Sequence, residues 1–146
     1  MKSVTIAGCG PGSRDYLTFA VVQAVNKADL LVGPARLIDL FPELKCEKLT
    51  LKDNYHEALG IIEEKRGDRE IVVLVTGDPG VHSFAKLVID RLGRPACNVL
   101  PGLSAVQCAF ALLKMSWDDA LIFSCHGHSL GGLESIVRHK DKVAVL

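Results

Sequence analysis

The chain has 146 residues, 49% of them apolar and 23% charged, which is typical of a soluble globular protein of one domain or two small lobes. Its 17 basic and 17 acidic side chains give a formal net charge of zero, which argues against a general nucleic-acid-binding protein. Five cysteines without a CxxC pair, no signal-peptide pattern and no bilayer-spanning stretch predict a cytoplasmic protein with free thiols, no membrane partner and no metal site.

Short apolar runs alternate with helical patterns from one end of the chain to the other. We expect strands at residues 3–8, 28–32, 46–51, 71–76, 97–100, 120–125 and 143–146. We expect helices at residues 15–27, 34–40, 54–66, 80–92, 104–114 and 130–139. Asp15 lies near the amino end of the first helix, where a carboxylate can cap free amide groups or interact favourably with the helix dipole. This strand–helix alternation predicts an α/β fold with a mostly parallel sheet.

The segment at residues 114–119 is the best candidate for a linker, because it follows an apolar helical pattern and precedes a fresh strand. It divides the chain into an amino-terminal α/β lobe, residues 1–114, and the start of a second α/β lobe, residues 115–146. The second lobe would hold two strands and one helix, and a two-stranded unit is marginal alone. We therefore expect the second lobe to be incomplete and the sequence to be truncated.

A glycine-rich loop, Gly8-Cys9-Gly10-Pro11-Gly12, follows the first predicted strand. It departs from the dinucleotide-binding fingerprint GxGxxG, because residue 11 is proline and residue 13 is serine. It is not a phosphate-binding P-loop either, since no Gly-Lys-Ser/Thr follows it. By itself the motif is equally compatible with a tight strand-to-helix turn and with a ligand-binding loop.

Two further turns stand at strand ends, Gly77-Asp78-Pro79-Gly80 and Pro101-Gly102-Leu103-Ser104. Asp78 is suited to accept hydrogen bonds from a ligand, and equally to cap a helix that begins near Pro79. Ser104 is placed to cap the next helix. Because the carboxyl ends of parallel strands form the edge where ligands bind, three such turns predict one small-molecule site.

His82 and the loop Cys125-His126-Gly127-His128 carry side chains suited to proton transfer or covalent catalysis. His82 would lie in the first turn of the helix after Pro79, where a single histidine is more often a surface residue. The loop lacks the further ligands of a metal site, and adjacent side chains in an extended segment point apart. We expect this loop to contact a ligand, and the sequence identifies no catalytic residue.

Together these motifs resemble the tetrapyrrole methylases, a family of enzymes that use S-adenosylmethionine. The matching residues cover nearly the whole chain in the family's order: Gly8–Gly12, Tyr16-Leu17-Thr18, Ala28-Asp29, Val32-Gly33, Gly77-Asp78-Pro79 and Pro101–Ala105. Within the family, the chain is most similar to the branch that methylates C5 of cobalt-precorrin-7, formerly precorrin-6Y, in cobalamin biosynthesis. The resemblance implies a C-methyltransferase for a precorrin or cobalt-precorrin intermediate, built from two α/β lobes and usually a homodimer.

The resemblance also implies a cleft that holds S-adenosylmethionine and, after transfer, S-adenosylhomocysteine. Carried over by motif, the residues on the cofactor side are Gly77, Asp78, Val81, Ser104 and Ala105. The loop of Gly10, Pro11 and Gly12 would face the tetrapyrrole. A tetrapyrrole carries several carboxylates, so Arg14 and Arg36 beside strand-end loops are candidates to bind it, although ordinary surface positions explain them equally well.

Other interpretations stay open. Another methylase of the same family would act on a different porphyrinoid, on a diphthamide precursor or on ribosomal RNA, and the neutral net charge disfavours the RNA. The chain would alternatively be a truncated, non-catalytic module for ligand binding or dimerisation. An NAD-dependent dehydrogenase is disfavoured by the broken dinucleotide fingerprint.

Overall fold

The computed structural model describes residues 2–125 and 132–146. The chain divides into two compact units, Met1–Ser104 and Ala105–Leu146, and each is described by itself. This division places the helix at Ala105–Leu113 with the second unit, whereas the sequence places it with the first lobe. The lobe boundary between residues 114 and 115 stays a prediction. In the described part of the chain, no helix has both the length and the apolar content to cross a membrane.

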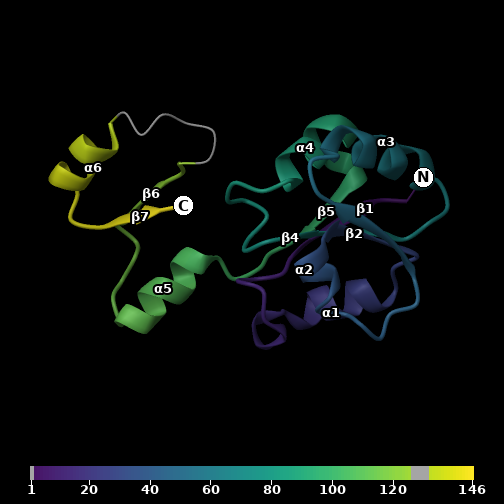
Figure 1. Cartoon of the computed structure of the whole chain (residues 1–146), viewed down its shortest axis with the longest axis horizontal. Coiled ribbons are helices and arrows are strands. Elements are labelled where there is room, and N and C mark those ends of the chain that lie inside the picture. Colours follow the sequence, from purple (N-terminus) through teal and green to yellow (C-terminus); the bar gives the residue numbers. More distant parts are fainter. Residues whose placement is uncertain (1, 126–131) are drawn as a thin grey trace. The chain divides into compact units, whose positions relative to one another are not determined.

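The first unit is built on a five-stranded parallel sheet, which confirms the predicted α/β fold (Figure 1). Its strands are β1 (Val4–Gly8), β2 (Leu30–Pro34), β3 (Glu47–Leu51), β4 (Ile71–Val75) and β5 (Cys97–Leu100). Their spatial order is β3-β2-β4-β1-β5. In register, Ile6 of β1 lies between Val73 of β4 and Val99 of β5. The loops that follow β1, β4 and β5 therefore begin side by side, at the carboxyl ends of neighbouring parallel strands.

Helices cover both faces of this sheet (Figure 1). They are α1 (Phe19–Asn26), α2 (Ala35–Ile38), α3 (Tyr55–Lys65) and α4 (Ala85–Leu92). One core cluster joins alternate strand residues such as Ile6 and Val73 to α3 and α4, while a second joins Ala7 and Leu74 to α1 and α2. Every residue of β4 is buried, as expected for a central parallel strand covered on both sides.

The first and fourth helices begin four and five residues later than the sequence predicted. Asp15 does not cap the first helix: it lies in the short 3-10 turn η1 (Arg14–Tyr16), where its backbone N–H donates to Ser13 Oγ at 3.3 Å. The helix α1 begins at Phe19, and Thr18 Oγ1 caps it by accepting from Val21 N at 3.3 Å. Because the Thr18 hydroxyl, directly before the helix, accepts from one of its free amide groups, the cap does not require the Asp15 carboxylate. Likewise α4 begins at Ala85 rather than at residue 80.

The second unit contains α5 (Ala105–Leu113), β6 (Leu121–Phe123), α6 (Leu133–His139) and β7 (Val143–Val145). The strands β6 and β7 pair in parallel, with Ile122 opposite Ala144. Apolar side chains of α5 and the residues of β7 line a groove of about 330 Å³ within this unit. The strands and helices predicted here are therefore present. The elements α5, β6 and β7 are one to three residues shorter than predicted, and α6 begins at Leu133 within the described residues.

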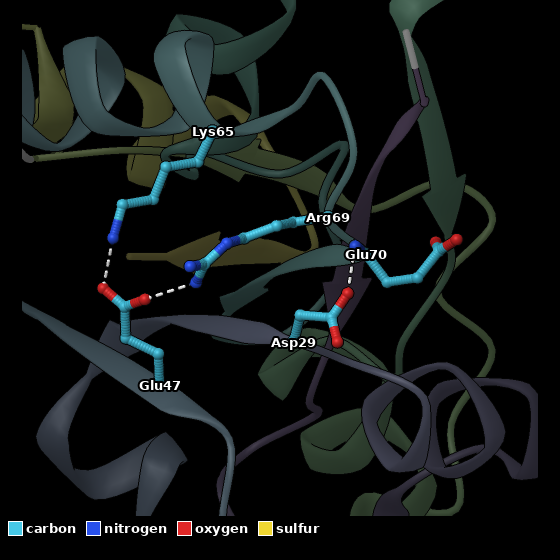
Figure 2. Close-up of polar contacts among 5 residues, drawn as sticks. All are labelled: Asp29, Glu47, Lys65, Arg69 and Glu70. Atoms are coloured by element: carbon cyan, nitrogen blue, oxygen red, sulfur yellow. Dashed lines mark hydrogen bonds and ion pairs between the residues drawn. The ribbon is translucent and has the colours of Figure 1, made fainter.

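Charged side chains near the amino ends of the strands form hydrogen bonds and ion pairs within the first unit (Figure 2). Glu47 at the start of β3 accepts hydrogen bonds from Lys65, at the end of α3, and from Arg69 Nη1 at 2.6 Å. These two cations hold the pKa of the Glu47 carboxyl below its usual range. Asp29 Oδ2 accepts from the backbone N–H of Glu70 at 2.8 Å, which aligns the segments before β2 and β4. Because these groups are exposed, each contributes little stability and mainly fixes geometry.

Two glycine-to-alanine substitutions test the packing of the sheet. An added Cβ on Gly33 of β2 would lie 2.9 Å from Leu74 Cβ on the buried strand β4, so Gly33→Ala should destabilise the fold by about 1–3 kcal/mol. Gly60 in α3 has open space, so Gly60→Ala should stabilise the fold by roughly 0.5–1 kcal/mol. Urea unfolding followed by circular dichroism measures both, and wild-type stability for Gly33→Ala would contradict the packing described.

Candidate functional site

The loops after β1 and β4 are joined by a pair of backbone hydrogen bonds. Gly10 N donates to Gly77 O at 3.2 Å, and Gly77 N donates to Gly10 O at 2.8 Å. Both glycines have left-handed backbone angles, with φ of 64° and 65°, which other residues adopt only with strain. One pair of backbone hydrogen bonds therefore joins the glycines of the two motifs. The pair can form because β1 and β4 are neighbouring strands.

The loop after β5 packs against the hydrogen-bonded Gly10–Gly77 pair, with no side chain between the backbones. An added Cβ on Gly8 would lie 2.6 Å from Gly102 N and 2.8 Å from Gly77 O. An added Cβ on Gly102 would lie 2.5 Å from Gly8 O. Because no real Cβ tolerates such contacts with backbone atoms, Gly8 and Gly102 both have to be glycine. We call the contact among Gly8, Gly10, Gly77 and Gly102 the glycine junction.

The side chain of Asp78 fastens the junction from the β4 side. Its Oδ1 accepts from Gly80 N at 2.8 Å, and its Oδ2 accepts from Gly102 N at 3.1 Å. The alternative role of Asp78, as the cap of a helix beginning near Pro79, is wrong, because α4 begins at Ala85. A carboxylate can accept about four hydrogen bonds, so Asp78 retains acceptor capacity for a ligand.

The predicted cofactor-binding residues that belong to the first unit are Gly77, Asp78, Val81 and Ser104, and they lie close together. Ser104 is buried, and an added Cβ on Gly77 would lie 3.7 Å from Ser104 Cα. Val81 N donates to Asp78 O at 3.1 Å, which folds residues 78–81 into a turn beside the junction. Ala105 follows Ser104 directly and begins α5 of the second unit.

The two arginines predicted to bind substrate have different surroundings. Arg36 Nη2 donates to Thr76 Oγ1 at the end of β4, and an added Cβ on Gly12 would lie 3.1 Å from Arg36 Nη1. Arg36 therefore lies between the loop of Gly10, Pro11 and Gly12 and the loop after β4. Arg14 instead forms an exposed ion pair with Glu43, at 2.7 Å, which holds the pKa of the Glu43 carboxyl below its usual value.

The cysteine inside the first loop is unsuited to covalent chemistry. Cys9 is fully buried, and desolvation raises the pKa of its thiol to about 12, so the thiol stays neutral near physiological pH. Of the loop Cys125–His128, predicted to contact a ligand, the described residues include only Cys125, whose backbone N–H donates to Leu146 O at 2.7 Å. Among the residues that are described, no cluster of three or more His, Cys, Asp or Glu side chains is arranged to hold a metal ion.

A cavity of about 160 Å³ lies at the carboxyl ends of β2, β3 and β4. Its lining includes Thr76 and His82, and His82 has a positive φ of 41°. Sequence reasoning missed this cavity because it followed glycine turns alone. Ligands bind at the carboxyl ends of parallel strands, and this rule also points to the cavity. Pro34, Leu51 and Thr76 stand at such strand ends and line it.

Comparison with known proteins identifies the family. Residues 3–146 match the model of the Tetrapyrrole (Corrin/Porphyrin) Methylases. The chain is 34% identical to a probable cobalt-precorrin-7 C(5)-methyltransferase of Methanocaldococcus jannaschii and 32% identical to the cobalt-precorrin-7 C(5)-methyltransferase of Salmonella typhimurium. Both alignments cover 98% of this chain and 70% of the relative.

A solved structure agrees on the fold. The precorrin-6Y methylase from Archaeoglobus fulgidus matches with a TM-score of 0.74 and 24% identity, over 99% of this chain and 72% of that one. The glycine junction, the parallel sheet and the match along nearly the entire sequence lead to one conclusion. The chain belongs to the tetrapyrrole methylase family.

Proposed function

We propose that this chain is an S-adenosylmethionine-dependent C-methyltransferase that methylates C5 of cobalt-precorrin-7 in cobalamin biosynthesis. The observation that carries the proposal is the identity of 32% and 34% to two cobalt-precorrin-7 C(5)-methyltransferases over 98% of the chain. The aligned length therefore includes all three loops of the glycine junction. A site made of backbone and one carboxylate also suits a reaction that needs alignment more than acid–base catalysis.

The residues around the junction fit such a cofactor. Gly77 presents backbone without a side chain, and Asp78 keeps lone pairs that hydroxyl or amino groups can donate to. We propose that Gly77, Asp78, Val81, Ser104 and Ala105 bind S-adenosylmethionine. When bound, the sulfonium supplies an already activated methyl group, which a nucleophilic ring carbon takes while the bonding pair stays on sulfur. The protein then has to position the two reactants and exclude water.

We propose that the macrocycle is bound from the β1 side, by the loop of Gly10, Pro11 and Gly12 together with Arg14 and Arg36. Guanidinium groups suit this role because they pair with carboxylates through two parallel hydrogen bonds. The contact of Arg36 with Thr76 holds its guanidinium at the edge of the sheet, beside the loop. Arg14 would have to exchange its exposed pairing with Glu43 for a pairing with substrate.

The lobes, assembly and location follow the family resemblance. We propose lobes at residues 1–114 and 115–146, a homodimer, and a cytoplasmic location. The segment between α5 and β6 contains no helix or strand, which supports a linker there. Leu112 and Leu113 near the end of α5 are 83% and 63% exposed, and exposed apolar side chains of this kind favour a subunit contact.

Replacing the carboxylate of the junction tests the cofactor site. Asp78→Asn keeps the shape but loses a charged acceptor, so the Kd for S-adenosylhomocysteine in calorimetric titration should rise roughly tenfold. Asp68→Asn, in the turn before β4, is the matched control and should bind like wild type. An unchanged Kd for Asp78→Asn, with its fold intact by circular dichroism, would remove Asp78 from the cofactor site.

Replacing the two arginines tests the substrate side. Arg36→Ala should raise the KM for cobalt-precorrin-7 roughly tenfold with a smaller effect on kcat, because a charged hydrogen bond to bound substrate is lost. Arg14→Ala should raise KM less, since Glu43 already competes for this side chain. Steady-state kinetics at fixed S-adenosylmethionine measures both. Whichever variant leaves KM unchanged identifies an arginine that does not bind the substrate.

A further inference from the structure

The cavity at the ends of β2, β3 and β4 is separate from the residues that the sequence assigned to the site. Its volume is about 160 Å³, and none of the residues predicted to bind cofactor or substrate line it. Pockets that enclose a whole drug-sized ligand measure about 300–1,000 Å³. This cavity therefore has room for a short arm of a larger ligand rather than for a complete ring.

The walls of the cavity are apolar and aromatic. Leu51, Leu74 and Val75 line it from the ends of the strands, and all three are buried. Tyr55 and Phe84 complete the wall, with ring centroids 5.3 Å apart. Such walls favour methylene groups, which gain free energy when they leave water.

The polar groups of the lining are hydrogen-bond donors. The Thr76 hydroxyl accepts a bond from the Arg36 guanidinium, so its own hydrogen is left to donate. The imidazole of His82 carries a further donor. Ser83 is already engaged, because its Oγ donates to Pro79 O at 2.7 Å and accepts from Ala85 N at 3.2 Å. The residues that line the cavity carry no carboxylate, which favours an anionic group there.

The backbone at His82 is held in a conformation that costs free energy. Its φ of 41° lies in the left-handed region, which a glycine would adopt without strain. Hydrogen bonds on both sides clamp it, from Val81 N to Asp78 O and from Ser83 Oγ to Pro79 O. Strained residues of this kind persist where the surroundings over-determine them, and they cluster at ligand sites.

We propose that this cavity binds one carboxylate side arm of the macrocycle, an acetate or a propionate, with its methylenes against Tyr55 and Phe84 and its carboxylate bonded by His82 and Thr76. The proposal rests on the proposed function, because it takes a tetrapyrrole as the substrate class. Arg36, which we propose binds the macrocycle, also donates a hydrogen bond to Thr76 and so orients the Thr76 hydroxyl. The cavity would then fix the rotation of the macrocycle, and so the carbon that faces the methyl group.

Substitution of His82 separates a binding role from a structural one. His82→Gly removes the imidazole and relieves the positive φ, so the variant should unfold at a higher urea concentration than wild type. In a fluorescence titration with uroporphyrin III, a tetrapyrrole with acetate and propionate arms, the same variant should show a Kd raised roughly tenfold. His82→Asn tolerates the left-handed backbone and should weaken binding similarly. Thr76→Val should also raise the Kd.

Matched controls make each outcome decisive. His56→Ala changes an exposed histidine of α3 outside the cavity lining, and should leave the Kd unchanged. If His82→Gly and Thr76→Val bind uroporphyrin III as tightly as wild type, the cavity is not an arm-binding site and the proposed function still stands. If wild type binds S-adenosylhomocysteine but no tetrapyrrole, the substrate class fails and the arm-binding cavity fails with it. If wild type binds neither, the proposed function itself is overturned.

Discussion

The architecture depends on the contact between two backbones, at Gly8 and Gly102. An added Cβ on either residue would lie 2.5–2.8 Å from backbone atoms of the other loop, so only glycine permits the approach. This contact exists because β5 pairs with β1 on one side while β4 pairs with it on the other. The strand order thus brings three loops, distant in sequence, to one point on the edge of the sheet.

That contact also determines which groups can face a ligand. With side chains excluded from the junction, backbone amides and carbonyls occupy its centre, and Asp78 is the charged group bonded into it. A cofactor with its own activated methyl group needs such a rigid, shaped surface more than it needs a catalytic acid or base. The buried thiol of Cys9, whose pKa is raised by desolvation, agrees with a site that positions its reactants rather than forming a covalent intermediate.

The parts that follow from local sequence were predictable, and those that depend on strand order were not. The strands, the α/β class and the family could be inferred because each glycine turn directly follows an apolar run. The partner of Asp78 could not be inferred, because Gly102 lies beside it only once β5 has paired with β1. The capping role that the sequence offered as one alternative for Asp15 and for Asp78 is wrong for a related reason. Thr18 caps α1, and Asp78 accepts hydrogen bonds from Gly80 and Gly102 instead. The cavity at His82 is formed by three strand ends and one strained turn, and no single motif encodes it.

We propose that the glycine junction holds the loops of the cofactor site in place, and the affinity of Gly102→Ala for S-adenosylhomocysteine tests this role. An added Cβ on Gly67, in the turn before β4, would meet no atom within 4 Å, so Gly67→Ala is the matched control. A Gly102→Ala variant that is folded by circular dichroism should bind S-adenosylhomocysteine at least about tenfold more weakly than wild type, and Gly67→Ala should bind it with unchanged affinity. Wild-type affinity in a folded Gly102→Ala variant would contradict it.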